Sequence, residues 1–353
     1  MAQGARAITM TVRIGMVGAG GVAVTHLVNL LRIPDADVVA IADVVPGAAE
    51  ACIRRVNAQQ DLNARPGDEP RRLRARVYDD YRAMLAEAGL HALYVCTPPA
   101  ARGAIELAAV GEGVALCIEK PVTLDLGVAR EVAAAIRGRN LVSSVCYQVR
   151  YARAVDDARR ALEGRPIAMG LGFMFGGVPA APWWRSRATS GGQLVEQATH
   201  TVDLMTSFLG NVDRVYAAGA LRVHRDVPGF DIHDTGAVTL HFVSGVVGSI
   251  VTTAVLGGGS TAGFPTGLHL FAADVRVEVW GASLKVVTAD RTDERRYTES
   301  PMQTLDADFV EAVRRRDPSR VRTPYADAAR TLAITLAGEE SARTGRVVEV
   351  ARI

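Results

Sequence analysis

The segment from Val12 to Asp43 most constrains what this chain can fold into. It opens with a short apolar, β-branched run at residues 12–17, typical of a buried parallel strand, and continues into the pattern G-x-G-x-x-A at residues 18–23. Gly18 permits a tight turn, Gly20 lets the backbone approach a pyrophosphate, and small Ala23 lets the following helix pack close to the strand. The run and the turn together predict the start of a nucleotide-binding α/β unit.

A second apolar run, residues 38–42, ends in Asp43 roughly twenty residues beyond the glycines, where a carboxylate would receive the ribose hydroxyls of an adenosine. Strand, turn, helix, strand and acid in this order favour a dinucleotide site over an ordinary glycine-punctuated α/β unit. Gly21 and Val22 begin the helix whose N–H groups would face the phosphates. Asp43 would repel a 2′-phosphate, so NAD is the preferred cofactor, with NADP possible.

Length and composition narrow the class of protein. A chain of 353 residues favours two domains, and 49% apolar residues are enough for sizeable cores. The net charge of +2 argues against nucleic acid or an anionic membrane as partner. The sequence shows no secretory leader and no apolar run of about 18 residues, so we expect a soluble, cytoplasmic protein. The cysteines are widely spaced, which favours buried thiols over a disulfide framework or a metal site: Cys52, Cys96, Cys117 and Cys146.

The order of elements predicts the fold class. Alternating strands and helices up to residue 148 indicate an α/β Rossmann domain with a doubly wound parallel sheet. Residues 61–74 interrupt this series with charge, proline and glycine, and are expected to form a surface insertion rather than a phosphate site. From residue 149 to 353 the pattern predicts an α+β domain with a large, mostly antiparallel open sheet. Its strands are expected at 212–222, 233–243, 246–255, 266–272, 275–280 and 283–288.

Polar residues follow two of the predicted parallel strands directly. Thr97 and Pro98 come after residues 91–96, and Glu119-Lys120-Pro121 comes after residues 114–118. The carboxyl ends of parallel strands face the ligand crevice, where a lysine can donate to an alcohol or carbonyl oxygen. Each segment taken alone is equally compatible with an ordinary surface turn.

A helix expected at 192–209 carries a polar stripe without the lysines or arginines that a solvated face usually mixes in. Glu196 and His200 lie four residues apart, close enough to hydrogen-bond, which would raise the basicity of the imidazole and fix its tautomer. Such a histidine suits a general base, although a plain solvent-facing stripe explains the pattern equally well. The stripe consists of Gln193, Glu196, His200 and Asp203.

In combination, the Gly18-Ala19-Gly20 turn, the Glu119-Lys120-Pro121 triplet and the Glu196-x-x-x-His200-x-x-Asp203 helix resemble the Gfo/Idh/MocA family of NAD(P)-dependent sugar and cyclitol oxidoreductases. The resemblance covers nearly the whole chain and is most specific up to about residue 210. It implies a C-terminal sheet that commonly builds homodimers or homotetramers.

The resemblance also implies roles for single residues. Lys120 would contact both nicotinamide ribose and substrate, His200 would be the acid/base, and Glu196 would stand where many members have Asp. Glu119, Gln148, Trp184 and Arg185 would lie at the cofactor. Arg150 and Trp183 would join Lys120, Glu196 and His200 at the substrate. Arg102 departs from the family, many members of which have histidine there.

The resulting hypothesis is reversible oxidation of a secondary alcohol on a sugar, sugar derivative or cyclitol. Two rivals stand beside it: an NAD-dependent glycosidase that uses transient oxidation, and a catalytically silent dinucleotide sensor. Release of an aglycone from a nitrophenyl glycoside without net NADH would favour the glycosidase, and nucleotide binding without turnover would favour the sensor. Which sugar or cyclitol is used, and in which direction, is open at this point.

Overall fold

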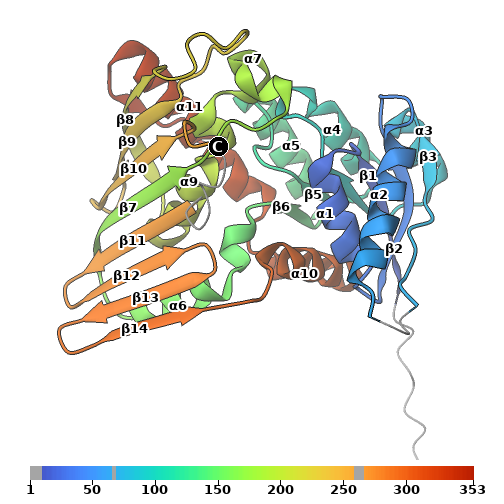
Figure 1. Cartoon of the computed structure of the whole chain (residues 1–353), viewed down its shortest axis with the longest axis horizontal. Helices are drawn as coiled ribbons and strands as arrows, with labels where there is room; N and C mark the ends of the chain where they lie inside the picture. The colour runs from blue at the N-terminus through green and yellow to red at the C-terminus, as the bar shows by residue number, and fades with distance from the viewer. Residues whose placement is uncertain (1–9, 66–68, 258–265) are drawn as a thin grey trace, which may run out of the picture.

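In the computed structural model, which describes residues 10–65, 69–257 and 266–353, the N-terminal half folds around a six-stranded parallel sheet of order β3-β2-β1-β4-β5-β6 (Figure 1). The order reverses direction beside β1, and such a switch point is where open α/β sheets bind ligands. The strands are β1 (Val12–Val17), β2 (Ala36–Ala42), β3 (Arg76–Tyr78), β4 (Ala92–Val95), β5 (Ala115–Ile118) and β6 (Ser143–Val145). The helices are α1 (Gly21–Leu30), α2 (Ala48–Asn63), α3 (Tyr81–Glu87), α4 (Ala104–Gly111) and α5 (Leu126–Gly138). The predicted Rossmann fold is confirmed.

The C-terminal half forms a nine-stranded sheet of order β14-β13-β12-β11-β7-β10-β9-β8-β15, antiparallel except for the pair β7 and β10. Its strands are β7 (Ile167–Phe175), β8 (Val212–Ala220), β9 (Thr235–Phe242), β10 (Val247–Thr253), β11 (Thr266–Ala272), β12 (Val275–Trp280), β13 (Ser283–Thr288), β14 (Thr292–Arg296) and β15 (Val348–Glu349). Helices α6 (Arg153–Leu162), α9 (Thr199–Leu209) and α11 (Tyr325–Thr344) pack against it. The predicted mostly antiparallel sheet is confirmed.

Three strands of this sheet were absent from the prediction: β7, β14 and β15. In β7, glycines dilute the apolar pattern, but the packing requires them, since a Cβ at Gly172 would lie 2.5 Å from the Thr201 Cγ2 atom of α9. Strand β14 is charged and mostly exposed, as edge strands often are. The insertion expected at 61–74 is shorter than predicted because α2 continues to Asn63, and residues 66–68 lie outside the described part.

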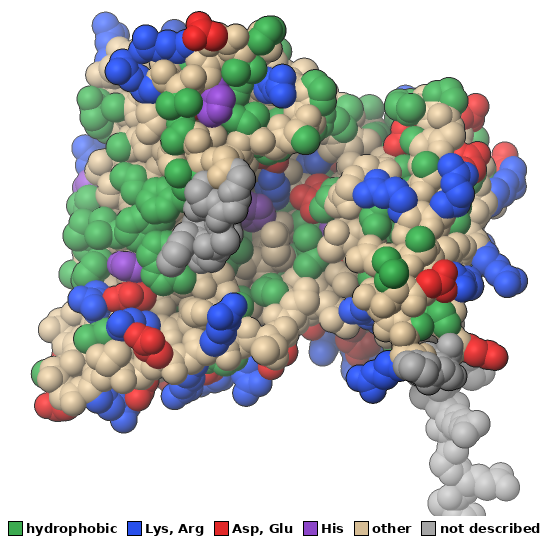
Figure 2. Space-filling view, in the orientation of Figure 1, with side chains coloured by type: hydrophobic (Ala, Val, Ile, Leu, Met, Phe, Trp, Pro, Cys, Tyr) green, Lys and Arg blue, Asp and Glu red, His purple; other side chains and the backbone are tan. Residues whose placement is uncertain are grey.

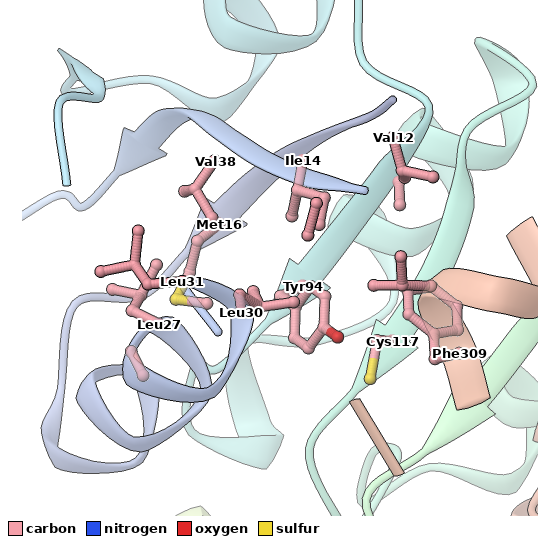
Figure 3. Close-up of a cluster of buried hydrophobic side chains, with 14 of the residues drawn as sticks. Val12, Ile14, Met16, Leu27, Leu30, Leu31, Val38, Tyr94, Cys117 and Phe309 are labelled. Atoms are coloured by element: carbon pink, nitrogen blue, oxygen red, sulfur yellow. The ribbon is translucent and has the colours of Figure 1, made fainter. Parts of the chain in front are cut away.

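Helix α10 (Pro301–Arg315) belongs to the C-terminal half by sequence but packs against the Rossmann domain. The Ser300 side chain accepts a hydrogen bond from Gln303 N at 3.3 Å and so caps the helix, with Pro301 in its first turn. The Phe309 ring meets Tyr94 of β4 edge-on at 5.5 Å, inside the core formed by β1, α1 and β4 (Figure 3). A division of the chain at 148/149 therefore leaves part of the first core on the second segment.

Among the described residues, no helix is both long and apolar enough to cross a membrane.

Candidate active site

The glycine turn after β1 has the geometry expected of a pyrophosphate site. Gly18 has φ +91°, and a Cβ there would lie 2.7 Å from the carbonyl carbon and oxygen of Cys96, so a side chain is excluded. Gly20 is the N-cap of α1, no side chain caps this helix, and added Cβ atoms at Gly20 and Gly21 would meet no atom within 4 Å. The first N–H groups of α1, Val22 among them, thus border open space that a phosphate fits.

Asp43 lies beside this turn at the end of β2. Its Oδ2 accepts a hydrogen bond from Ala19 N at 2.7 Å and its Oδ1 accepts one from Val45 N at 2.8 Å. These bonds fix the carboxylate at the edge of the glycine turn, where ribose hydroxyls are expected.

Arg102 ties together the ends of β4 and β5. Its buried guanidinium donates to the carbonyl oxygen of Thr97 at 3.1 Å and to the carbonyl oxygens of Glu119 and Pro121. These contacts could not be predicted from the sequence, because the acceptors are main-chain carbonyl oxygens, which every residue carries. Thr97 and Pro98 are thereby held at the edge of the sheet beside the Glu119-Lys120-Pro121 triplet.

Lys120 and Glu196 join the two halves of the chain. The Lys120 Nζ donates to the Glu196 carbonyl oxygen at 2.7 Å and forms an ion pair with the Glu196 carboxylate. The Trp184 Nε1 donates to the other carboxylate oxygen of Glu196 at 2.6 Å. Glu196 is therefore bound to Lys120 and Trp184, and the expected hydrogen bond to His200 is wrong for this structure.

The helix expected at 192–209 is interrupted. It consists of α8 (Gln193–Glu196) and α9, and Lys120 contacts the chain at the break. In a continuous helix His200 N would bond to the Glu196 carbonyl oxygen, but Lys120 uses that oxygen and His200 N bonds to the Gln197 carbonyl oxygen at 3.3 Å. The solvent-facing interpretation of the stripe is also wrong, because Gln193, Glu196 and Asp203 are all buried.

His200 packs edge-on against the Tyr147 ring, with centroids 5.8 Å apart. Burial, and secondarily the charge of nearby Lys120, lowers the pKa of His200 to about 4. The imidazole is therefore neutral near pH 7 and able to accept a proton. The influence of Lys120 on this pKa places the two predicted catalytic side chains in one electrostatic environment.

Arg150 is paired with protein carboxylates. Its Nε and Nη2 bond to the two Asp203 oxygens at 2.7 and 2.6 Å, and its Nη1 bonds to Asp327 at 3.0 Å. This pairing favours a structural role for the Arg150 guanidinium, and its predicted place at the substrate stays a prediction.

Several buried polar atoms have no hydrogen-bond partner within the described part of the chain, and six of them belong to segments predicted to line the site. They are Thr97 Oγ1, Gln148 Oε1, Arg185 Nε, Gln193 Nε2, Gln197 Oε1 and His200 Nδ1. Gln197 was missed by the sequence analysis. Buried unpaired polar atoms are costly, so this group fits a site that receives a polar ligand. Figure 2 shows the surface hollowed between the two lobes.

Three residues that follow β7 were predicted at the site: Trp183, Trp184 and Arg185. Trp184 is fully buried with Phe230, Ile232 and Ala254, and Trp183 packs against this cluster. Trp184, expected at the cofactor, instead binds Glu196, while Arg185 has a buried Nε without a partner among the described atoms.

Family models match both halves of the chain. Residues 12–147 match the oxidoreductase family with an NAD-binding Rossmann fold, and residues 157–286 match the GFO/IDH/MocA C-terminal domain. The chain belongs to the Gfo/Idh/MocA family. It is therefore an oxidoreductase with an NAD-binding domain, and the glycine turn described above fits that cofactor.

Relatives of this Gfo/Idh/MocA protein include named dehydrogenases. Myo-inositol 2-dehydrogenase of Thermotoga maritima is 22% identical over 88% of this chain and 90% of its own length. D-apiose dehydrogenase of Paraburkholderia graminis is 27% identical over 78% of this chain and 77% of its own length. The solved structure of levoglucosan dehydrogenase with NADH and levoglucosan has a TM-score of 0.81 at 19% identity, covering 97% of this chain and 100% of that one, which supports the shared fold.

Proposed function

We propose that this protein catalyses the reversible, NAD-dependent oxidation of a secondary alcohol on a sugar, sugar derivative or cyclitol. The observation that carries the proposal is the approach of Lys120, from the Rossmann domain, to the site of neutral His200 on α9. The relatives named as inositol, apiose and levoglucosan dehydrogenases support the substrate class.

The residues divide the chemistry between them. His200, kept neutral by burial, takes the hydroxyl proton as general base. The Lys120 ammonium, held by Glu196, steadies negative charge on the substrate oxygen as that proton leaves. When bound, NAD supplies the acceptor for the hydride from the same carbon. Glu196, fixed by Trp184, keeps the ammonium at the cleft rather than in solvent.

The test uses Lys120→Ala and His200→Ala, with the partly exposed Lys285→Ala and His91→Ala as matched controls. Both site variants are expected to bind NADH, measured by fluorescence, while kcat falls on the order of 10²- to 10⁴-fold. The controls should keep both properties. Full turnover in both site variants would end the assignment.

The substrate itself is best found by a thermal-shift screen. Sugars, inositols, uronates and nucleotide sugars are added with NAD or NADP, and hits are checked for reduced cofactor by absorbance. A neutral polyol is expected to stabilise the protein most, since the Arg150 guanidinium is already paired with carboxylates. Stabilisation by uronates alone would refute that expectation.

We further propose a homodimer or homotetramer formed through the outer face of the large sheet. On this face Val247 pairs with Met169, and Val251 pairs with Phe173, and both valines and Met169 are exposed. Figure 2 shows hydrophobic side chains gathered over these strands. Contiguous exposed apolar surface is typical of interfaces. Val251→Glu should yield a smaller species in light scattering after gel filtration, and an unchanged mass would contradict the proposal.

A further inference from the structure

A buried network of charged side chains lies directly behind Lys120. His26 of α1 is fully buried, with its Nδ1 2.7 Å from the Asp306 Oδ1 and its Nε2 3.3 Å from the Glu119 Oε1. The second Glu119 oxygen accepts a hydrogen bond from the Lys120 main-chain N–H at 3.1 Å. A continuous path of polar contacts therefore runs from α10 to the backbone of the proposed catalytic lysine.

The pKa shifts of His26 and Glu119 both favour the charged form of the side chain. Burial lowers the pKa of His26, but Asp306 and the nearby Cys146 raise it more, so that the pKa of His26 lies well above its ordinary value. Burial raises the pKa of Glu119, but the bond to His26 and nearby charges lower it more, so that it lies below the ordinary value. His26 is therefore an imidazolium between the carboxylates of Asp306 and Glu119. Its attraction to both offsets part of the desolvation cost of the three groups.

Asp306 is itself held in place on both oxygens. Asn29 Nδ2 donates to its Oδ2 at 2.9 Å, and the Tyr94 hydroxyl donates to its Oδ1 at 3.2 Å. Both donors come from the Rossmann domain, whereas Asp306 comes from α10. Figure 3 shows Tyr94 beside Phe309 of the same helix, in the densely packed core. The carboxylate therefore has one fixed orientation toward His26.

Glu119 was expected to contact the cofactor, but its carboxylate is turned inward to His26 and to its neighbour's N–H. It is 7% exposed. Its conformation sets where the backbone of Lys120 lies, because the acceptor and the donor belong to adjacent residues. Arg102 holds the carbonyl oxygen of Glu119, so the turn is fixed through both its side chain and its main chain.

We propose that Asp306, His26 and Glu119 are positioning residues for Lys120, with Asp306 supplied to the Rossmann domain by α10. The inference rests on the role of Lys120 in the proposed function. Loss of the Asp306 charge would free the His26 ring and relax the Glu119-Lys120 turn. Displacing a catalytic group by about 1 Å can cost on the order of 10²-fold in rate.

The main test is Asp306→Asn, which keeps the shape of the side chain and removes its charge. The control is Asp308→Asn on the same helix, where the half-buried carboxylate lies 3.7 Å from Arg322. For Asp306→Asn we expect kcat to fall roughly 10- to 100-fold, while KM for the alcohol and Kd for NADH change less than about threefold. Asp308→Asn should change none of these. A fall in melting temperature with unchanged kcat would mean that the network serves stability alone, and would overturn the proposal.

A second variant is milder, in case Asp306→Asn does not fold. Tyr94→Phe removes one donor to Asp306 and leaves the ring packed, so kcat is expected to fall about two- to fivefold with the same constancy of KM. An increase in KM with constant kcat would contradict a positioning role.

A third measurement is independent of turnover. Amide hydrogen exchange of the peptide covering residues 116–124 should be faster in Asp306→Asn than in the wild type and in Asp308→Asn. If the wild type oxidises no alcohol, the proposed function fails, but this readout still decides whether the network orders the turn at Lys120. Unchanged exchange would overturn the inference.

Metal analysis is a further check, because His26, Glu119 and Cys146 place ligand atoms within 4.8 Å of one another. One equivalent of tightly bound zinc would show that these residues form a metal site and not a charge network, and would overturn the proposal.

Discussion

The pairing of Arg150 with Asp203 makes a prediction that separates a structural role from a substrate-binding role. The Arg150 side chain is 10% exposed and the Asp203 side chain 1%, and two hydrogen bonds join the guanidinium to the carboxylate. Removing one partner of such a buried pair leaves an uncompensated charge, which costs about 3–5 kcal/mol. Arg150→Met should therefore lower the free energy of unfolding by roughly that amount at pH 8.

The loss should depend on pH in a definite direction. Burial raises the pKa of Asp203 to about 6 even though Arg150 lowers it. The folded protein therefore holds this proton more tightly than the unfolded chain, so Asp203 lowers stability as the pH rises from about 4 through 6. Without Arg150 the pKa should climb further, so the variant should lose less stability at pH 5, where the carboxyl is protonated, than at pH 8.

Urea denaturation at the two pH values measures this difference. Arg153→Met is the matched control, because its ion pair with Glu299 is mostly exposed and should contribute little to stability. Arg150→Met with Asp203→Asn should recover much of the loss at pH 8. If Arg150→Met keeps full stability and instead raises KM, Arg150 binds substrate and the structural interpretation is refuted.

Three further predictions concern titrating and cofactor-facing groups. Because the pKa of His200 is about 4, kcat/KM should stay on its plateau down to about pH 5, and an acid limb centred near 6.5 would contradict this. Burial raises the pKa of Glu339 to about 7 despite Arg187, so its proton is held more tightly in the folded state and Glu339 lowers stability as the pH rises through 7. Glu339→Gln should therefore gain stability relative to the wild type between pH 5 and pH 8, by about 2–3 kcal/mol in urea melts, and an equal effect at both pH values would contradict the cause. Asp43→Asn should raise the ratio of NADP to NAD in kcat/KM about tenfold, and an unchanged ratio would mean that Asp43 does not select the cofactor.

The Rossmann half was predictable because its signals are local. Each parallel strand is a continuous apolar run, and the glycine turn and Asp43 follow their strands directly. Lys120 could be placed at the crevice for the same reason, since a residue that ends a parallel strand must lie at that edge of the sheet.

The rest of the site depended on contacts that no local pattern contains. Glu196 and His200 have helical spacing, but the helix is interrupted between them, and the Glu196 carbonyl oxygen accepts a hydrogen bond from Lys120, 76 residues earlier. Arg102 donates to main-chain carbonyl oxygens. Every residue has one, so the sequence alone does not show which of them Arg102 contacts. The positions of Trp184 and Arg150 likewise follow from carboxylates that only the folded chain brings near.

The arrangement around Lys120 shows why the two lobes must act together. Glu196 from the C-terminal domain holds its ammonium, and Asp306 from α10 reaches its backbone through His26 and Glu119. Both contacts come from residues later in the chain than the Rossmann domain, so the parallel sheet carries the lysine but does not by itself fix it. A proton acceptor on α9 and a lysine just after β5 can share one substrate only if these interdomain contacts hold their relative position, since rate depends steeply on that geometry.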